Sequence, residues 1–204
     1  STPANSSAAS DVYKRQKGVR TLGIVNVVGS SIAREADNVM YTWAGPEIAV
    51  ATTKAYSTQL IAQYLLAMKF AKVRGTVSQN DFDAMIQSLE RLPEQISLLL
   101  SHKENVQRFA NRYLAAEHVF FIGRGIDYAI SMEGSLKLKE ISYIHSEAYA
   151  AGELKHGTIS LIEDGRLVVA VLTQPEFYKK TISNIQEVKL SLIHISEPTR
   201  RVVI

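Results

Sequence analysis

The stretch HVFFIGRGIDYAISMEGSLKLKEIS, residues 118–142, holds the pattern from which the fold can be inferred. Its first six residues, HVFFIG, are apolar and aromatic, as in a strand that is covered on both faces. Gly123 and Gly125 then predict a tight turn, and residues 126–142 follow with a helical pattern. A strand, a glycine turn and a helix in this order predict an α/β fold.

The rest of the chain repeats this alternation. Residues 21–29, 38–45 and 167–173 also predict strands. Strands that alternate with helices predict parallel sheets flanked by helices. In the first half of the chain we expect a short helix capped by Ser30 or Ser31 and an apolar, buried helix that ends near Ala71. A third helix should begin at Ser78, and Pro93 should kink or divide it. Further helices are expected at residues 103–116 and 126–142, in a segment through His156, and after Pro175.

The helical stretch 54–116 separates the strands into two groups, which indicates parts of two consecutive α/β units. We assign residues 18–75 to the C-terminal part of a first unit and residues 76–116 to connecting helices. Residues 117–189 then form the N-terminal part of a second unit.

The two ends of the chain differ from its body. Residues 1–17 and 190–204 together carry five basic and two acidic side chains, which account for the net charge of +3. Both ends resemble translated adapter sequence, so we interpret them as an artefactual or disordered arm and an artefactual tail. The alternative is a natural arm in front and an edge strand at Ser191–Ile195.

Composition excludes several classes of function. The body of the chain is electrically neutral, which argues against a nucleic-acid partner. The longest apolar helix candidate, residues 60–71, is shorter than the roughly 20 residues of a membrane span, and the N-terminus has no apolar core of a signal peptide. Cysteine is absent, which fits a reducing compartment, so we expect a cytoplasmic protein.

Three ionisable residues of the helix expected at 126–142 share one face, because Glu133, Lys137 and Glu140 are spaced four and three residues apart. The common fate of this spacing is a solvated ladder of ion pairs, which contributes a few tenths of a kcal/mol. The apolar neighbours Leu136 and Ile141 leave little of the helix free for water. A lysine and a glutamate held together there could transfer protons instead.

Other polar positions are weaker candidates. Gly123 and Gly125 could hold an anion, although such glycines more often serve a positive φ angle. The hydroxyls in residues 51–54 could cap a helix or bind a phosphate or sugar. His156 lies in a polar turn between glycines, where core packing is not expected, and the other histidines show no ligand spacing with it, so no metal site is predicted.

Three blocks of this sequence carry a resemblance: VGSSIAREAD (28–37), AGPEIAVATTKAYSTQL (44–60) and MEGSLKLKEISYIHSEAYAAGELKHGT (132–158). Together they resemble the isomerase region of the glutamine–fructose-6-phosphate aminotransferases (isomerizing), the glucosamine-6-phosphate synthases. The resemblance extends over residues 18–189. It implies parts of two tandem SIS (sugar isomerase) units with a flavodoxin-like, three-layer α/β/α fold.

The resemblance also implies a reaction and a site. Members of that family convert fructose 6-phosphate and ammonia from glutamine into glucosamine 6-phosphate, without a cofactor or metal. Glu140 matches the base that moves a proton between C1 and C2, and Lys137 matches its partner. His156 matches a histidine that the neighbouring subunit of a homodimer donates for ring opening. Val50 and Thr52 match positions that contact the sugar, with Thr52 replacing a serine of some members.

Two alternatives remain within the same fold. An SIS-type glucosamine-6-phosphate deaminase would share Lys137, Glu140 and His156, because ring opening and C1/C2 proton transfer belong to both reactions. A non-catalytic SIS sensor of sugar phosphates would need no base at Glu140. A glutaminase domain encoded upstream of residue 1 would favour the synthase.

The family's phosphate-binding serine and threonine loops, its glutaminase domain and its C-terminal lysine have no match in this chain. We therefore expect the chain by itself to form no glucosamine 6-phosphate, because the phosphate-binding and ammonia-supplying parts are missing. A coupled assay with fructose 6-phosphate and glutamine or ammonia checks this expectation. Measurable product would contradict it.

Overall fold

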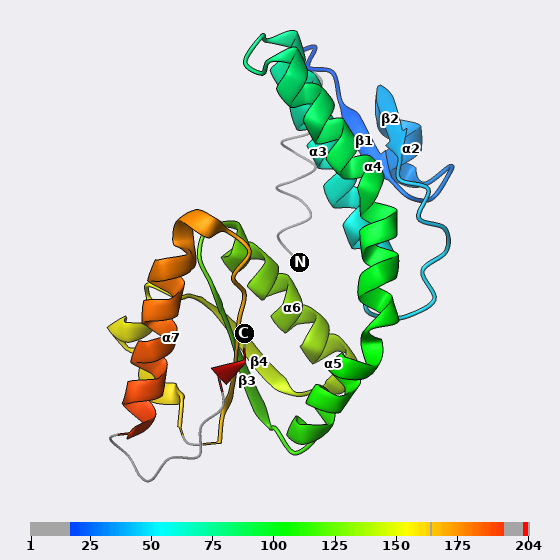
Figure 1. The fold of residues 1–204 in the computed structure, drawn as a ribbon. Helices are drawn as coiled ribbons and strands as arrows, with labels where there is room; N and C mark the ends of the chain where they lie inside the picture. Colours follow the sequence, from blue (N-terminus) through cyan, green and yellow to red (C-terminus); the bar gives the residue numbers. More distant parts are fainter. Residues whose placement is uncertain (1–16, 164, 194–201, 204) are drawn as a thin grey trace. The chain divides into compact units, whose positions relative to one another are not determined.

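The computed structural model describes residues 17–163, 165–193 and 202–203 (Figure 1). The chain divides into two compact units, Ser1–Ile96 and Ser97–Ile204. The first contains β1 (Leu22–Val25), α2 (Ser31–Glu35), β2 (Asn38–Tyr41), α3 (Lys54–Val73) and most of α4 (Gln79–Ser101). The second contains α5 (Lys103–Ala110), η1 (Asn111–Tyr113), β3 (His118–Gly123), α6 (Ile126–Ser142), β4 (His145–Ala150), η2 (Leu154–His156), η3 (Thr158–Leu161), β5 (Leu167–Ala170), η4 (Pro175–Phe177), α7 (Tyr178–Ile193) and β6 (Val202–Val203).

The first unit is built on a parallel pair of strands. β1 and β2 pair from Leu22↔Asn38 to Val25↔Tyr41, with α2 between them in the sequence. Ser30 caps α2 as predicted, because its side chain accepts a hydrogen bond of 3.3 Å from the Ala33 N–H. The strand–helix–strand order of an α/β unit is therefore confirmed in this part of the chain.

The two long helices of the first unit differ from expectation. α3 was expected to be buried on most sides, but only Ala55, Ala62 and Met68 are buried and the side chain of Phe70 is 63% exposed. The described sheet of this unit has two strands and offers little surface on which a helix of 20 residues could be buried. Pro93 does not divide α4, which is helical throughout Gln79–Ser101. None of the described helices combines the length and apolarity needed to cross a bilayer.

The second unit has a parallel sheet in the order β4-β3-β5-β6. β3 pairs with β4 along its whole length, from His118↔His145 to Gly123↔Ala150, and with β5 on its other side. The chain therefore leaves β3 toward one side and returns on the other as β5. The carboxyl ends of β3 and β5 border such a reversal, which is where open α/β sheets commonly bind ligands.

Helices cover both faces of this sheet. Gly134 of α6 lies so close to the Phe121 ring that an added Cβ atom would be 3.2 Å from it. Ile185 and Val188 of α7 instead join Phe120 and Ile122 in one buried cluster. Neighbouring residues of a strand point to opposite faces, so α6 and α7 lie on opposite sides of the sheet. The predicted three layers are thus present in this unit.

The chain after α6 was predicted incorrectly. A helical segment through His156 was expected, but residues His145–Ala150 form β4 and Leu154–His156 form the short 3₁₀ helix η2. α6 ends because Tyr143 adopts a left-handed conformation, with φ of 59°, and its N–H donates to the Lys139 carbonyl. The strand then pairs with β3, and this pairing outweighs the helix preference of its alanines.

The C-terminal end offers a second correction. Residues 191–193 of the possible edge strand at Ser191–Ile195 are helical and belong to α7, while residues 194–195 lie outside the described part. Val202 and Val203 form β6 and pair in parallel with β5. The predicted interpretation of residues 1–17 and 190–204, and the boundaries of the two units at 18–75, 76–116 and 117–189, stay predictions.

Candidate active site

Lys137 of α6 lies between two carboxylates. Its Nζ is 2.8 Å from Glu140 Oε2 and 3.3 Å from Glu133 Oε1. The three side chains are between 22% and 30% exposed, so each is largely withdrawn from water in this chain alone. The buried positions of α6, Asp127, Ser131 and Ser135, occupy its other side. The spacing prediction of one shared face is therefore confirmed.

The carboxylates keep Lys137 protonated. The hydrogen bond to Glu140 raises the pKa of Lys137; partial desolvation opposes this rise, and the bond to Glu133 adds to it. Lys137 is therefore a cation across the physiological pH range and cannot serve as a base. It can stabilise negative charge on a substrate oxygen, while Glu140 is the group that can take a proton.

Apolar side chains surround the three charged residues. Ile130, Leu136 and Ile141 are 42%, 42% and 68% exposed, although they lie on the same outward side of α6. A solvated ion-pair ladder would have polar neighbours there. The outward side of α6 therefore combines the charged group with exposed apolar side chains.

The glycine turn before α6 has a structural role. An added Cβ atom at Gly123 would lie 2.5 Å from the Asp127 carbonyl, and Gly125 has a φ of 57°. The carboxylate of Asp127 lies at the start of the helix, where an anion could otherwise bind. It accepts hydrogen bonds from the Thr173 N–H, at 2.9 Å, and from the Thr173 hydroxyl. The structure therefore gives no support for an anion site at this turn.

His156 belongs to the same unit and ends η2. Its backbone N–H donates to the Glu153 carbonyl at 3.0 Å, and its side chain is exposed. The imidazole forms no hydrogen bond with any residue that the structure describes. The exposed imidazole lies next in sequence to Gly157, which has a φ of 143°.

Val50 and Thr52 lie in the first unit, on the loop between β2 and α3. Val50 is 95% exposed and Thr52 is partly buried. They and the α6 residues thus belong to different units. The sequence reading missed Glu47 on this loop, whose Oε1 accepts hydrogen bonds of 3.1 Å from both the N–H and the hydroxyl of Thr53. No spacing rule could have found it, because six residues of irregular loop separate the partners.

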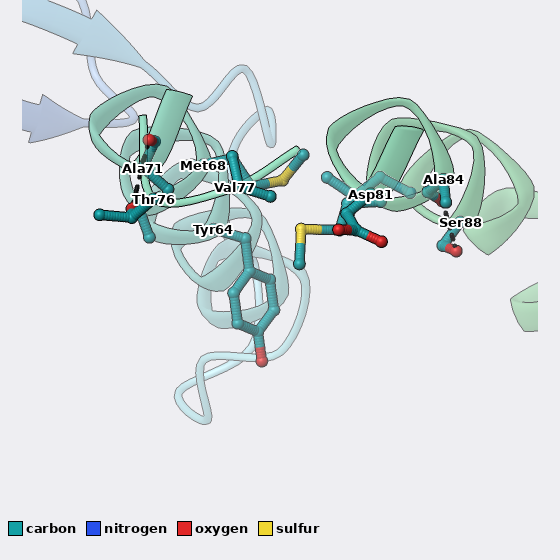
Figure 2. Close-up of a pocket in the computed structure, with 11 residues that line it drawn as sticks. Tyr64, Met68, Ala71, Thr76, Val77, Asp81, Ala84 and Ser88 are labelled. Carbon is teal, nitrogen blue, oxygen red and sulfur yellow. Dashed lines mark hydrogen bonds between the residues drawn. The ribbon is translucent and has the colours of Figure 1, made fainter. Parts of the chain in front are cut away.

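One groove in the first unit has the wrong chemistry for a sugar phosphate. It measures about 780 Å³ and lies between α3 and α4, with mainly apolar walls (Figure 2). Its single carboxylate, Asp81, already accepts a 2.6 Å hydrogen bond from Ser78 outside the groove lining. A phosphate needs cations or several N–H donors, which this lining does not supply. The described residues also contain no cluster of three potential metal ligands.

Comparison with known proteins shows the family of the chain. The protein-family model of the SIS domain matches residues 4–69 and 113–194, which together make up more than half of the chain. The chain belongs to the SIS domain family. The SIS fold inferred from the sequence is thereby confirmed.

Among its SIS relatives are several aminotransferases. The chain is 59% identical over 175 residues to the glutamine–fructose-6-phosphate aminotransferase (isomerizing) of Caldanaerobacter subterraneus, covering 86% of the chain and 29% of that protein. It is 53% identical over 174 residues to the enzyme of the same name from Clostridium tetani, covering 85% and 29%. The chain thus spans less than a third of the length of these relatives.

Solved structures show the same fold. The C-terminal domain of glucosamine-fructose-6-phosphate aminotransferase from Francisella tularensis is 34% identical, with a TM-score of 0.84 over 93% of this chain and 57% of that one. Glucosamine-6-phosphate deaminase from Thermotoga maritima is 26% identical, with a TM-score of 0.63 over 84% and 49%.

The Asp127 network predicts a pH-dependent change in stability. Burial favours the neutral acid, but the bonds from Thr173 and Gln174 outweigh it and hold the pKa of Asp127 below its ordinary value. The carboxylate therefore stabilises the fold above pH of about 4, and this contribution is lost as pH falls through the lowered pKa. Asp127→Asn should lower the free energy of unfolding at pH 7 by about 1–3 kcal/mol.

Urea unfolding of both proteins between pH 7 and pH 3 measures this effect. The difference between wild type and Asp127→Asn should shrink below pH of about 4. Glu94→Gln, a change at an exposed carboxylate of α4, serves as the matched control and should stay within about 0.5 kcal/mol of wild type. A difference for Asp127→Asn that is independent of pH would contradict the assignment.

Proposed function

We propose that this chain is part of the isomerase region of a glutamine–fructose-6-phosphate aminotransferase (isomerizing), which forms glucosamine 6-phosphate from fructose 6-phosphate and glutamine-derived ammonia. The observation that carries the proposal is the 2.8 Å bond between Lys137 and Glu140, in a chain that is 59% identical to one such aminotransferase. The proposed substrate is therefore a sugar phosphate, and the enzyme a cytoplasmic one.

The chemistry follows from the two side chains. Once ammonia has condensed at C2 of the open-chain sugar, Glu140 takes a proton from C1 and returns it at C2. In the same conversion the O1 hydroxyl loses its proton and the imine nitrogen gains one. The C1 alcohol therefore becomes an aldehyde, the C2 imine becomes an amine, and the proton count is unchanged. Lys137 carries a positive charge throughout, because the carboxylates raise its pKa, and it stabilises the negative charge that develops on the sugar oxygen.

His156 and the first unit complete the proposed site. The exposed imidazole of His156 assists ring opening in the neighbouring subunit of a homodimer, acting as a proton carrier. Val50 and Thr52 contact the sugar from the loop before α3. The proposal rests here on the resemblance of residues 44–60 and 132–158, and on the exposure of Val50 and His156.

A chimera tests the role of Glu140. Residues 18–189 replace the matching segment of the Caldanaerobacter aminotransferase, whose remaining parts complete the enzyme. Glu140→Gln in this chimera should lower kcat for glucosamine 6-phosphate formation by about 10²–10⁴-fold, because the amide cannot take the C1 proton. Binding of fructose 6-phosphate, measured by calorimetry, should stay within a few fold.

Glu94→Gln in the same chimera is the control for loss of one exposed carboxylate, and full turnover is expected from it. Unchanged turnover of Glu140→Gln would exclude the base assignment and would favour a non-catalytic sugar-phosphate sensor.

Mixed dimers test the donation of His156. Chimeras carrying His156→Ala or Glu140→Gln should each be inactive alone. Mixing their subunits under conditions that allow exchange should restore partial activity, since one site of each mixed dimer then combines an intact Glu140 with an intact His156 from the other subunit. If the mixture stays as inactive as the separate variants, His156 does not act across subunits.

A glucosamine-6-phosphate deaminase is the second candidate. The Thermotoga maritima deaminase shares the fold over 84% of this chain, with 26% identity. Both reactions need C1/C2 proton transfer, so the α6 residues alone do not separate them. A glutaminase domain encoded upstream of this segment in the parent gene favours the aminotransferase, and ammonia release from glucosamine 6-phosphate without glutamine favours the deaminase.

A further inference from the structure

The loop that carries Val50 and Thr52 is held at both ends by side chains. At its start, Asn26 Oδ1 accepts from the Ala44 N–H at 2.8 Å, and Asn26 Nδ2 donates to the Gly45 carbonyl at 2.7 Å. Trp43 between β2 and this point has a φ of 53°, which is unusual for a bulky residue. At its end, Glu47 holds Thr53. These side-chain hydrogen bonds restrain the loop on both sides of its exposed residues.

Glu47 is bound to the residue at the N-terminus of α3. Thr53 occupies the cap position, but its hydroxyl makes no capping bond and instead donates to Glu47 Oε1 at 3.1 Å. The hydrogen bond from the Thr53 N–H lowers the pKa of Glu47; burial opposes this, and the Thr53 hydroxyl and the Ala55 N–H lower it further. Glu47 is therefore ionised at neutral pH, with its charge at the positive end of the helix dipole.

The second carboxylate oxygen of Glu47, Oε2, can still accept a hydrogen bond. Oε2 is shielded from solvent and has no hydrogen-bond partner among the described residues. It can accept a hydrogen bond but cannot donate one while the carboxylate is ionised. A sugar hydroxyl supplies a donor, whereas the ester phosphate of a sugar has no proton to give as a dianion, and any phosphate would be repelled by the carboxylate charge.

We propose that Glu47 is a positioning and specificity residue, whose carboxylate fixes the Val50–Thr52 loop through Thr53 and keeps phosphate away from the N-terminus of α3. The loop then faces the uncharged hydroxyl end of the substrate. This inference rests on the proposed function, since it assumes that Val50 and Thr52 contact a sugar phosphate. It deepens that function by setting the orientation of the substrate.

Two substitutions separate the geometric role from the charge. Glu47→Gln keeps a carbonyl oxygen that can accept from Thr53 but loses the charge, whereas Glu47→Ala loses both. In the chimera, Glu47→Ala should raise KM for fructose 6-phosphate about tenfold, with kcat within about threefold, because it removes hydrogen bonds to a charged group that orders the loop. Glu47→Gln should keep KM within about threefold of the parent chimera.

Inhibition by inorganic phosphate measures the effect of the Glu47 charge. Its inhibition constant should fall about two- to fivefold in both Glu47 variants, since the carboxylate no longer opposes an anion at the helix start. Glu90→Gln, at an exposed position of α4, is the matched control and should change neither constant. If Glu47 had only a structural role, Glu47→Ala would lower the unfolding temperature and the amount of active enzyme. KM and the inhibition constant of phosphate would then stay unchanged, and this outcome overturns the proposal.

A binding measurement without catalysis separates the role of the Glu47 charge from the proposed aminotransferase function. In the chain itself, phosphate titration followed by NMR should leave the Lys54 and Ala55 amides unmoved in wild type and shift them in Glu47→Gln. Shifts of equal size in both proteins overturn the role of the Glu47 charge. If the chimera is inactive but the NMR shifts in the chain still differ between wild type and Glu47→Gln, the result counts against the proposed aminotransferase function. It leaves the role of the Glu47 charge supported.

Discussion

The close approach of α6 to the end of β3 is the constraint on which the candidate site depends. Gly123 permits it, since any side chain there would collide with the Asp127 backbone. Asp127 then joins the start of the helix to Thr173, which follows β5. These contacts fix the origin and direction of a rigid helix. The positions of Lys137 and Glu140, three to four turns further on, follow from them, so the turn acts on the site through geometry and not by binding a ligand.

The two units use a carboxylate at the start of a helix in the same way. Asp127 occupies the start of α6 and Glu47 the start of α3, and each accepts both an N–H and a hydroxyl from a single threonine. The negative ends of these side chains balance the positive helix ends. The chain therefore closes two helix starts to an added anion with its own residues. In the proposed function, the phosphate of the sugar is bound by donors elsewhere.

The sequence predicted features that depend on local pattern. The strand at residues 118–123, the bounds of the helix at 126–142 and the cap at Ser30 were all found, because apolar runs, helical spacing and capping residues act within a few positions. β4 was missed because its alanines and glutamate favour a helix, and only pairing with β3 makes it a strand. The Asp127–Thr173 bonds join residues 46 positions apart, so no local signal reveals them. Spacing singled out Lys137 and Glu140, and flanking glycines singled out His156. Val50 and the roles of all these residues came from the resemblance.

Lys137 is shared by two carboxylates, and the net charge of these three side chains changes during the proposed proton transfer. One cation and two anions leave the group with a net charge of −1. When Glu140 accepts a proton in the proposed reaction, the group becomes neutral while the bound sugar gains negative charge. The excess charge thus moves from the protein to the substrate and remains beside the same ammonium. Glu133 takes no proton in this scheme and leaves one negative charge beside Lys137 after Glu140 has been protonated.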